Sequence, residues 1–152
     1  MIAKNLKLIL LAGLLAGTLD ISSAFVDYYI ATGKNPAGIL NYVASGLLGK
    51  AAFGDGAMFP VLGLLLHYII AMSFTFFFFY IYSKLSLQKI NWILTGILYG
   101  IFIWLVMNLV VVPLSNTTKY PFTSFRIIKS MLILIVMIAL PLSFTAKKYF
   151  KN

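Results

Sequence analysis

The residues best suited to chemistry are a few polar side chains inside long apolar stretches. Asp20 lies in the first such stretch and His67, the only histidine, lies in the second. A carboxylate near the centre of a membrane helix costs about 2.5–3.5 kcal/mol on insertion scales, so it normally faces a protein interior or a water-filled cavity. An acid and an imidazole in such surroundings could hold or exchange a proton, as in proton-linked transport.

Depth along the expected helices predicts that these side chains meet. If each helix is counted inward from the same membrane face, Asp20 lies about ten residues down, or ~15 Å at the helical rise. His67 and Trp104 lie nine residues down and Asn108 five. We expect a common polar pocket, because unpaired polar groups facing lipid are costly. Three alternatives remain: Asp20 and His67 only fix the helix register, they do not touch, or Asn108 serves only as an interhelical hydrogen-bonding group.

A second acidic residue lies close to the expected membrane surface. Asp27 follows Asp20 by seven residues and shares its helical face. Arg126 and Lys129 begin the fourth apolar stretch and would reach the same surface. We therefore expect an ion pair between Asp27 and one of these cations at the ends of their helices.

Composition argues against most enzyme classes. The chain has one histidine, no cysteine and three acids, all of them aspartates. A conventional zinc or di-iron site is therefore not expected. Neither a nucleophile-elbow serine nor a glycine-rich phosphate loop is present. We predict no catalytic residue, metal or cofactor, and no enzymatic activity.

The overall composition is that of a membrane protein. Of the 152 residues, 62% are hydrophobic and only 10% are charged, whereas soluble domains carry roughly a quarter charged residues. Four stretches reach the ~20 apolar residues that a span requires. The expected spans, within a single all-α domain over 1–152, are 8–30, 58–82, 90–113 and 127–144. Pro141 predicts a kink or an early stop in the last of them.

The segment between the first two spans has its own helical pattern. Asn35 and Pro36 suit a helix start, and apolar residues then recur at helical spacing to about residue 53. The segment is too short for a comfortable span. We expect a short interfacial or re-entrant helix over about 36–53, either a surface linker or a plug over a cavity.

Glycines at helical spacing predict where helices pack closely. Gly13 and Gly17 share a face of the first span with Asp20, and Gly96 and Gly100 share a face of the third. Small residues at such spacing let neighbouring helix backbones approach.

The net charge of +9 comes from cations near the ends of the spans, which is typical of membrane anchors and not of a nucleic-acid site. The lysine-flanked apolar start imitates a secretory signal, but the apolar character continues and favours an uncleaved span. Seven cations fall on the side of the termini and five on the other, which favours cytoplasmic termini. The seven are Lys4, Lys7, Lys84, Lys89, Lys147, Lys148 and Lys151, and the five are Lys34, Lys50, Lys119, Arg126 and Lys129.

Several glycine-rich motifs together resemble small four-span bacterial membrane proteins with no established activity. They are Ala12–Asp20, Ala44–Lys50, Leu62–His67 and Gly96–Gly100. The resemblance implies a bacterial cytoplasmic membrane and this fold, and it transfers no site residue. We expect a small transporter- or channel-like protein for an unidentified small molecule or ion, with the lipid bilayer as its surroundings. A homodimer would give a transporter a wider pathway. The alternative is a structural or accessory membrane protein whose polar residues only fix helix packing.

Overall fold

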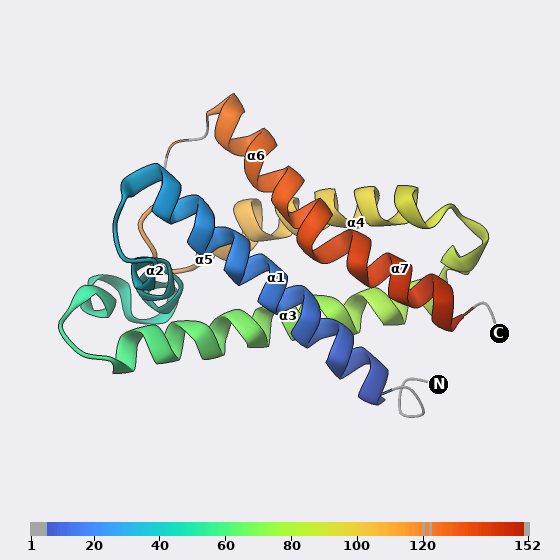
Figure 1. The fold of residues 1–152 in the computed structure, drawn as a ribbon, viewed down its shortest axis with the longest axis horizontal. Helices are drawn as coiled ribbons and strands as arrows, with labels where there is room; N and C mark the ends of the chain where they lie inside the picture. The colour runs from blue at the N-terminus through green and yellow to red at the C-terminus, as the bar shows by residue number, and fades with distance from the viewer. Residues whose placement is uncertain (1–5, 120, 122, 151–152) are drawn as a thin grey trace.

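The computed structural model describes residues 6–119, 121 and 123–150 and is an antiparallel helical bundle (Figure 1). Four of its helices are long and apolar enough to cross a membrane. Two of them are uninterrupted, α1 (Leu6–Thr32) and α3 (Met58–Lys84). The third, Trp92–Leu114, comprises α4 (Trp92–Val106), a π-helical turn (Met107–Val111) and α5 (Val112–Leu114). The fourth, Ser124–Tyr149, comprises α6 (Ser124–Leu134), a π-helical turn (Ile135–Ala139) and α7 (Leu140–Tyr149). The predicted all-α fold with four spans is confirmed.

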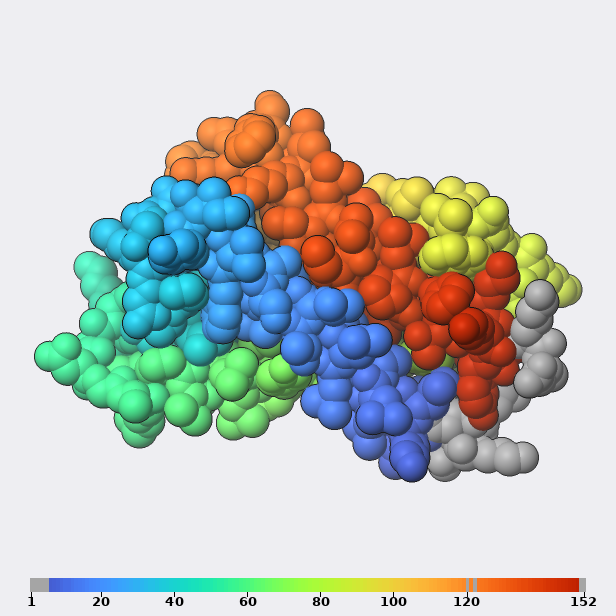
Figure 2. All heavy atoms as spheres, viewed as in Figure 1, coloured from blue at the N-terminus to red at the C-terminus, as the bar shows by residue number. Residues whose placement is uncertain are grey.

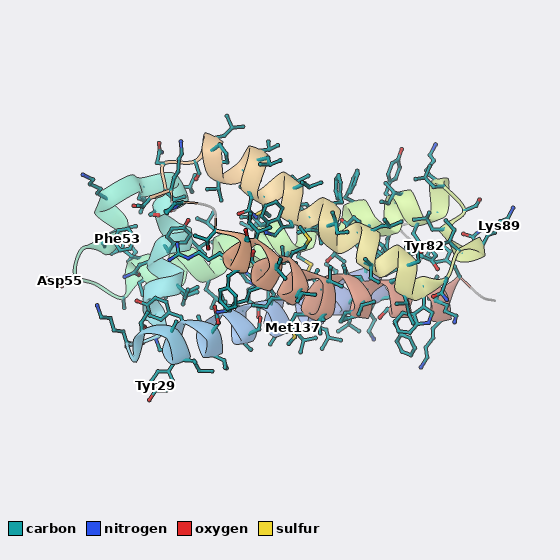
Figure 3. The ribbon with its side chains drawn as sticks, turned by 90° about the horizontal axis from the view of Figure 1, so that it is seen from above. Tyr29, Phe53, Asp55, Tyr82, Lys89 and Met137 are labelled. Carbon is teal, nitrogen blue, oxygen red and sulfur yellow. The ribbon has the colours of Figure 1, made fainter. Side chains whose placement is uncertain are left out.

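The connections between the helices determine which segments lie at the same end of the bundle. The first residues of α1, the last residues of α7 and the turn after α3, which includes a short 3₁₀ helix (Leu87–Lys89), lie at one end of the bundle (Figure 1). Figure 3 labels Tyr82 and Lys89 at this end and Tyr29, Phe53 and Asp55 at the opposite end. Both described ends of the chain therefore lie on one side, as an even number of spans requires. Of the cations counted in the sequence, Lys4 and Lys151 lie outside the described residues.

The outer faces of the long helices are apolar. Large side chains such as Leu65, Leu98 and Leu132 are more than half exposed, although water would disfavour them. Figure 2 shows the outer surface from one side, where α1 and the helix Ser124–Tyr149 lie side by side. This surface suits a hydrocarbon environment.

The core towards the terminal end of the bundle is aromatic. Phe78, Phe79, Tyr82 and Tyr99 are almost completely buried together. The rings of Phe78 and Tyr99 lie 4.6 Å apart, and the Tyr99 hydroxyl donates to the Phe74 carbonyl oxygen at 2.6 Å. These contacts join α3 to α4.

The two glycine stripes pack against different neighbours. A Cβ on Gly17 would lie 3.1 Å from the Tyr68 ring and 3.2 Å from Ala71, so this stripe faces α3. A Cβ on Gly100 would lie 2.8 Å from the Ile135 Cα, and one on Gly96 would lie 3.2 Å from the Leu140 Cα. The stripe of α4 therefore faces the last helix.

Both π-helical turns come just before a proline. Pro113 and Pro141 cannot donate to the carbonyls four residues earlier, Leu109 and Met137, and their rings crowd those carbonyls. Local widening of the helix relieves this crowding. An early stop at Pro141 is therefore wrong, because the helix continues to Tyr149.

The short helix α2 (Ala37–Leu48), followed by a 3₁₀ turn (Gly49–Phe53), folds back against α3. The Asn35 side chain accepts a hydrogen bond from the Ala37 amide at 2.9 Å and so caps its start. Gly63 permits the close approach, because a Cβ there would lie 2.6 Å from the Leu40 carbonyl carbon. Gly63 is five residues into α3, so α2 docks about 7 Å below the start of that helix.

We predict that Gly63→Ala destabilises the protein by about 1–3 kcal/mol, because the added methyl group overlaps the backbone of α2. Thermal unfolding in detergent measures the effect. Gly46→Ala is the matched control, since its Cβ would meet only the Ser115 Cβ at 3.8 Å. Equal stability of the two variants would contradict the tight docking of α2.

Candidate functional site

The only histidine of the chain bonds to the backbone of a neighbouring helix. His67 Nε2 on α3 lies 2.9 Å from the Gly17 carbonyl oxygen on α1. A carbonyl oxygen only accepts, so Nε2 must carry the hydrogen and donate it. Nδ1 is then the nitrogen that carries no hydrogen in the neutral ring.

The side chains around this bond explain how the imidazole reaches a helix backbone. Gly17 has no side chain, which leaves its carbonyl open to α3. Next to it, the Thr18 and Tyr68 hydroxyls lie 2.8 Å apart and form a second polar link between the same two helices. The His67 and Tyr68 rings meet edge to face, with centroids 5.4 Å apart.

Asp20 lies one turn beyond Gly17 and is partly buried. It lies close enough to His67 for the two side chains to interact electrostatically when both are ionised. Within the described part of the chain, no hydrogen bond or ion pair reaches the carboxylate. The acid and the imidazole are therefore electrostatic neighbours, without a direct hydrogen bond between them.

Trp104 and Asn108 belong to a separate polar group between α4 and α6. Trp104 Nε1 donates to Ser130 Oγ at 2.8 Å, and Ser130 Oγ donates to the Arg126 carbonyl oxygen at 2.7 Å. Asn108 Nδ2 donates to the Trp104 carbonyl oxygen at 3.0 Å, within its own helix. Among the described residues, no donor reaches the Asn108 amide oxygen.

A cavity of about 200 Å³ opens beside this group, at the end of the bundle that carries α2. Its walls come from α2, the helix Trp92–Leu114, the loop that follows and the start of α6. They are formed by Tyr42, Trp104, Asn108, Val112, Pro113, Lys119, Pro121, Arg126, Ile127 and Ser130. Two of these side chains are cationic and none is acidic.

The four predicted pocket residues thus fall at two places. Trp104 and Asn108 line the cavity, whereas Asp20 and His67 lie at the contact between α1 and α3. The reason is the direction of the two stripes. The stripe of α1 that contains Asp20 meets α3, and the stripe of α4 that contains Trp104 meets the last helix.

Asp27 forms an ion pair with Lys129, the second of the two cations that the sequence offered. Both side chains keep a little more than a third of their surface exposed. Arg126, the other candidate, lines the cavity instead.

The sequence did not predict that Tyr42, Lys119 and Ser130 would line the cavity. Ser130 follows Arg126 by four residues and could have been placed on the same helical face. Tyr42 and Lys119 gave no comparable signal, because they reach the cavity only through the docking of α2 and the path of a loop. Among the described residues, no three metal-binding side chains gather.

Comparison of the chain with protein families, curated proteins and solved structures found no match. The function is therefore inferred from the geometry of the chain itself.

We predict that His67→Phe lowers the stability of the protein by about 1 kcal/mol, because it keeps a ring but removes the donor to the Gly17 carbonyl. Thermal unfolding in detergent is the measurement. Ile69→Phe serves as the control, since Ile69 is 52% exposed on the outer face of the same helix. If His67→Phe unfolds no earlier than this control, the bond to Gly17 contributes nothing to stability.

Proposed function

We propose that this chain is a small integral membrane protein of the transporter or channel class, and that its solute site is the cavity between α2, α4 and α6. The observation that supports the proposal is the cavity itself, lined by an amide, two cations and a tryptophan at one end of an otherwise apolar bundle. Ligand sites in helical bundles have this character, mostly apolar with a few placed polar groups. Polar side chains within membrane-spanning segments normally face a protein interior or a water-filled cavity.

The location that we propose is a bacterial cytoplasmic membrane, with both termini in the cytoplasm. The excess of cations at the terminal end supports this orientation, and the cavity would then open towards the outer face. Several of these lysines lie near aromatic rings, as Lys148 does at 4.7 Å from the centre of the Phe144 ring. Such pairs suit the interface between lipid and water.

The proposal extends to two copies of the chain. The cavity walls include no residue of α1 or α3, so a path through one copy would have to pass the packed aromatic core. A homodimer would place a wider path between two bundles.

One observation favours a purely structural role as the second candidate. His67, Tyr99 and Ser143 each reach a backbone carbonyl of another helix, with the Ser143 hydroxyl donating to the Trp92 carbonyl at 2.7 Å. Bonds of this kind lock helices together without any ligand. In that case the cavity would be a packing defect.

We predict that a thiol at position 108 reacts with a membrane-impermeant methanethiosulfonate at least an order of magnitude faster than one at position 109. Thiols need water to ionise and react. The natural chain has no cysteine, so Asn108→Cys and Leu109→Cys each carry a single reactive group. Leu109 is 57% exposed on the outer face at nearly the same depth and is the control. Equal, slow reaction of both would contradict a water-filled cavity, and labelling only from the cytoplasmic side would reverse the proposed orientation.

We predict that Val112→Phe slows solute flux severalfold, because the larger side chain fills part of the cavity. Efflux of two permanently charged probes, benzenesulfonate and phenyltrimethylammonium, is measured from proteoliposomes against protein-free vesicles. Val110→Phe is the control, since Val110 is 48% exposed on the outer face. Asp20→Asn in the same assay tests whether the partly buried acid takes part in solute flux. If neither probe crosses faster than in protein-free vesicles, transport of solutes of this size is refuted.

A further inference from the structure

The charges around the cavity are unbalanced. Lys119 and Arg126 both line it, and the chain has only three acids to neutralise them. Asp27 is paired with Lys129, Asp20 lies at the contact between α1 and α3, and Asp55 lies in the exposed turn before α3. None of the three is part of the cavity wall. The electrostatic potential inside the cavity is therefore positive.

The rest of the wall is largely apolar. Val112, Pro113 and Ile127 supply aliphatic surface, and the buried Trp104 contributes the small part of its indole that reaches the wall. The indole N–H is bonded to Ser130, so it would not donate a hydrogen bond to an occupant. An occupant would thus have an apolar body as well as a charged group.

The volume limits how much of that occupant the cavity can enclose. A space of about 200 Å³ equals the share of roughly six or seven liquid waters. This space suits a single small ring or a short chain with one ionic group. A whole phospholipid would not enter it.

We propose that the cavity binds a small organic anion, with its carboxylate, sulfonate or phosphate group at Lys119 and Arg126 and its apolar body against Trp104. Arg126 also has an interaction within the protein, but its guanidinium offers five donors and can serve both. The guanidinium fork can pair with two oxygens of a carboxylate, sulfonate or phosphate at once, while Lys119 adds a point charge. This inference rests on the proposed function only in taking the cavity as the solute site.

Trp104 itself provides the test. The chain has two tryptophans, and Trp92→Phe leaves Trp104 as the single fluorescent reporter. The purified variant in phosphatidylcholine nanodiscs is titrated with three probes of similar size: benzenesulfonate, its neutral analogue benzenesulfonamide, and the cation phenyltrimethylammonium. We expect a saturable change in Trp104 emission with benzenesulfonate and at least tenfold weaker binding of the other two. No saturation by benzenesulfonate, or equal binding of the neutral or cationic probe, would overturn the proposal.

Substitutions in the same single-tryptophan background locate the anionic group. Lys119→Gln and Arg126→Gln should each raise the Kd for benzenesulfonate by about tenfold, since each removes a charge-assisted partner. Arg126→Lys keeps the charge and loses the fork, so its Kd should lie between those of the parent and of Arg126→Gln. Lys50→Gln is the control, because Lys50 is an exposed cation at the same end of the bundle and lies outside the cavity wall. If Arg126→Gln does not fold, the exposed loop residue Lys119 decides, and an unchanged Kd in Lys119→Gln refutes the assignment.

Further outcomes distinguish a lipid headgroup from a free solute as the source of the anion. They also distinguish failure of the anion inference from failure of the proposed function. If nanodiscs containing phosphatidylglycerol alter Trp104 emission and abolish the benzenesulfonate response, a lipid headgroup occupies the cavity and a free solute is refuted. If the neutral probe binds best while Val112→Phe still slows flux, the anion inference fails and the proposed function stands. If benzenesulfonate binds but no probe crosses the membrane, the anion site stands and transport fails.

Discussion

The structure depends on one constraint, which is that hydrocarbon offers no hydrogen-bond partner. A polar side chain in a membrane-spanning segment must find its partner inside the protein. In this bundle several partners across helices are backbone carbonyls, and His67, Tyr99 and Ser143 each reach one on another helix. Because these carbonyls belong to fixed helices, each bond also fixes the rotation of one helix against its neighbour.

Such bonds form only where two backbones come close. Gly17 leaves its carbonyl open to the imidazole on α3, and Gly63 lets the backbone of α2 reach α3. On the other side of the bundle, Gly96 and Gly100 leave room for the last helix to pack closely around the widened turn that precedes Pro141. Glycine spacing, proline position and polar pairing are thus parts of one packing solution. The two stripes nevertheless turn towards different helices, which separates the polar residues of α1 from those of α4.

The end of the bundle that carries α2 departs from this pattern. There the side chains do not close on one another completely, and the walls of the remaining cavity contain cations without acids. The same region is built from a short helix, a loop and a helix start, which are elements that adapt more readily than long helices. A site for a charged solute is consistent with both properties.

The sequence alone determined the number of spans, their approximate bounds, the short helix between the first two and the faces that carry the glycines. These features follow from local rules, namely the length of apolar stretches and the helical repeat, so neighbours are not needed to predict them. Depth was predictable for the same reason, since each residue advances a helix by a fixed rise. Only the tertiary structure decided that Trp104 meets Ser130 while His67 meets Gly17, and that Tyr42 and Lys119 reach the cavity. The direction in which a helical face points depends on the packing of all the helices at once, and no single segment contains that information.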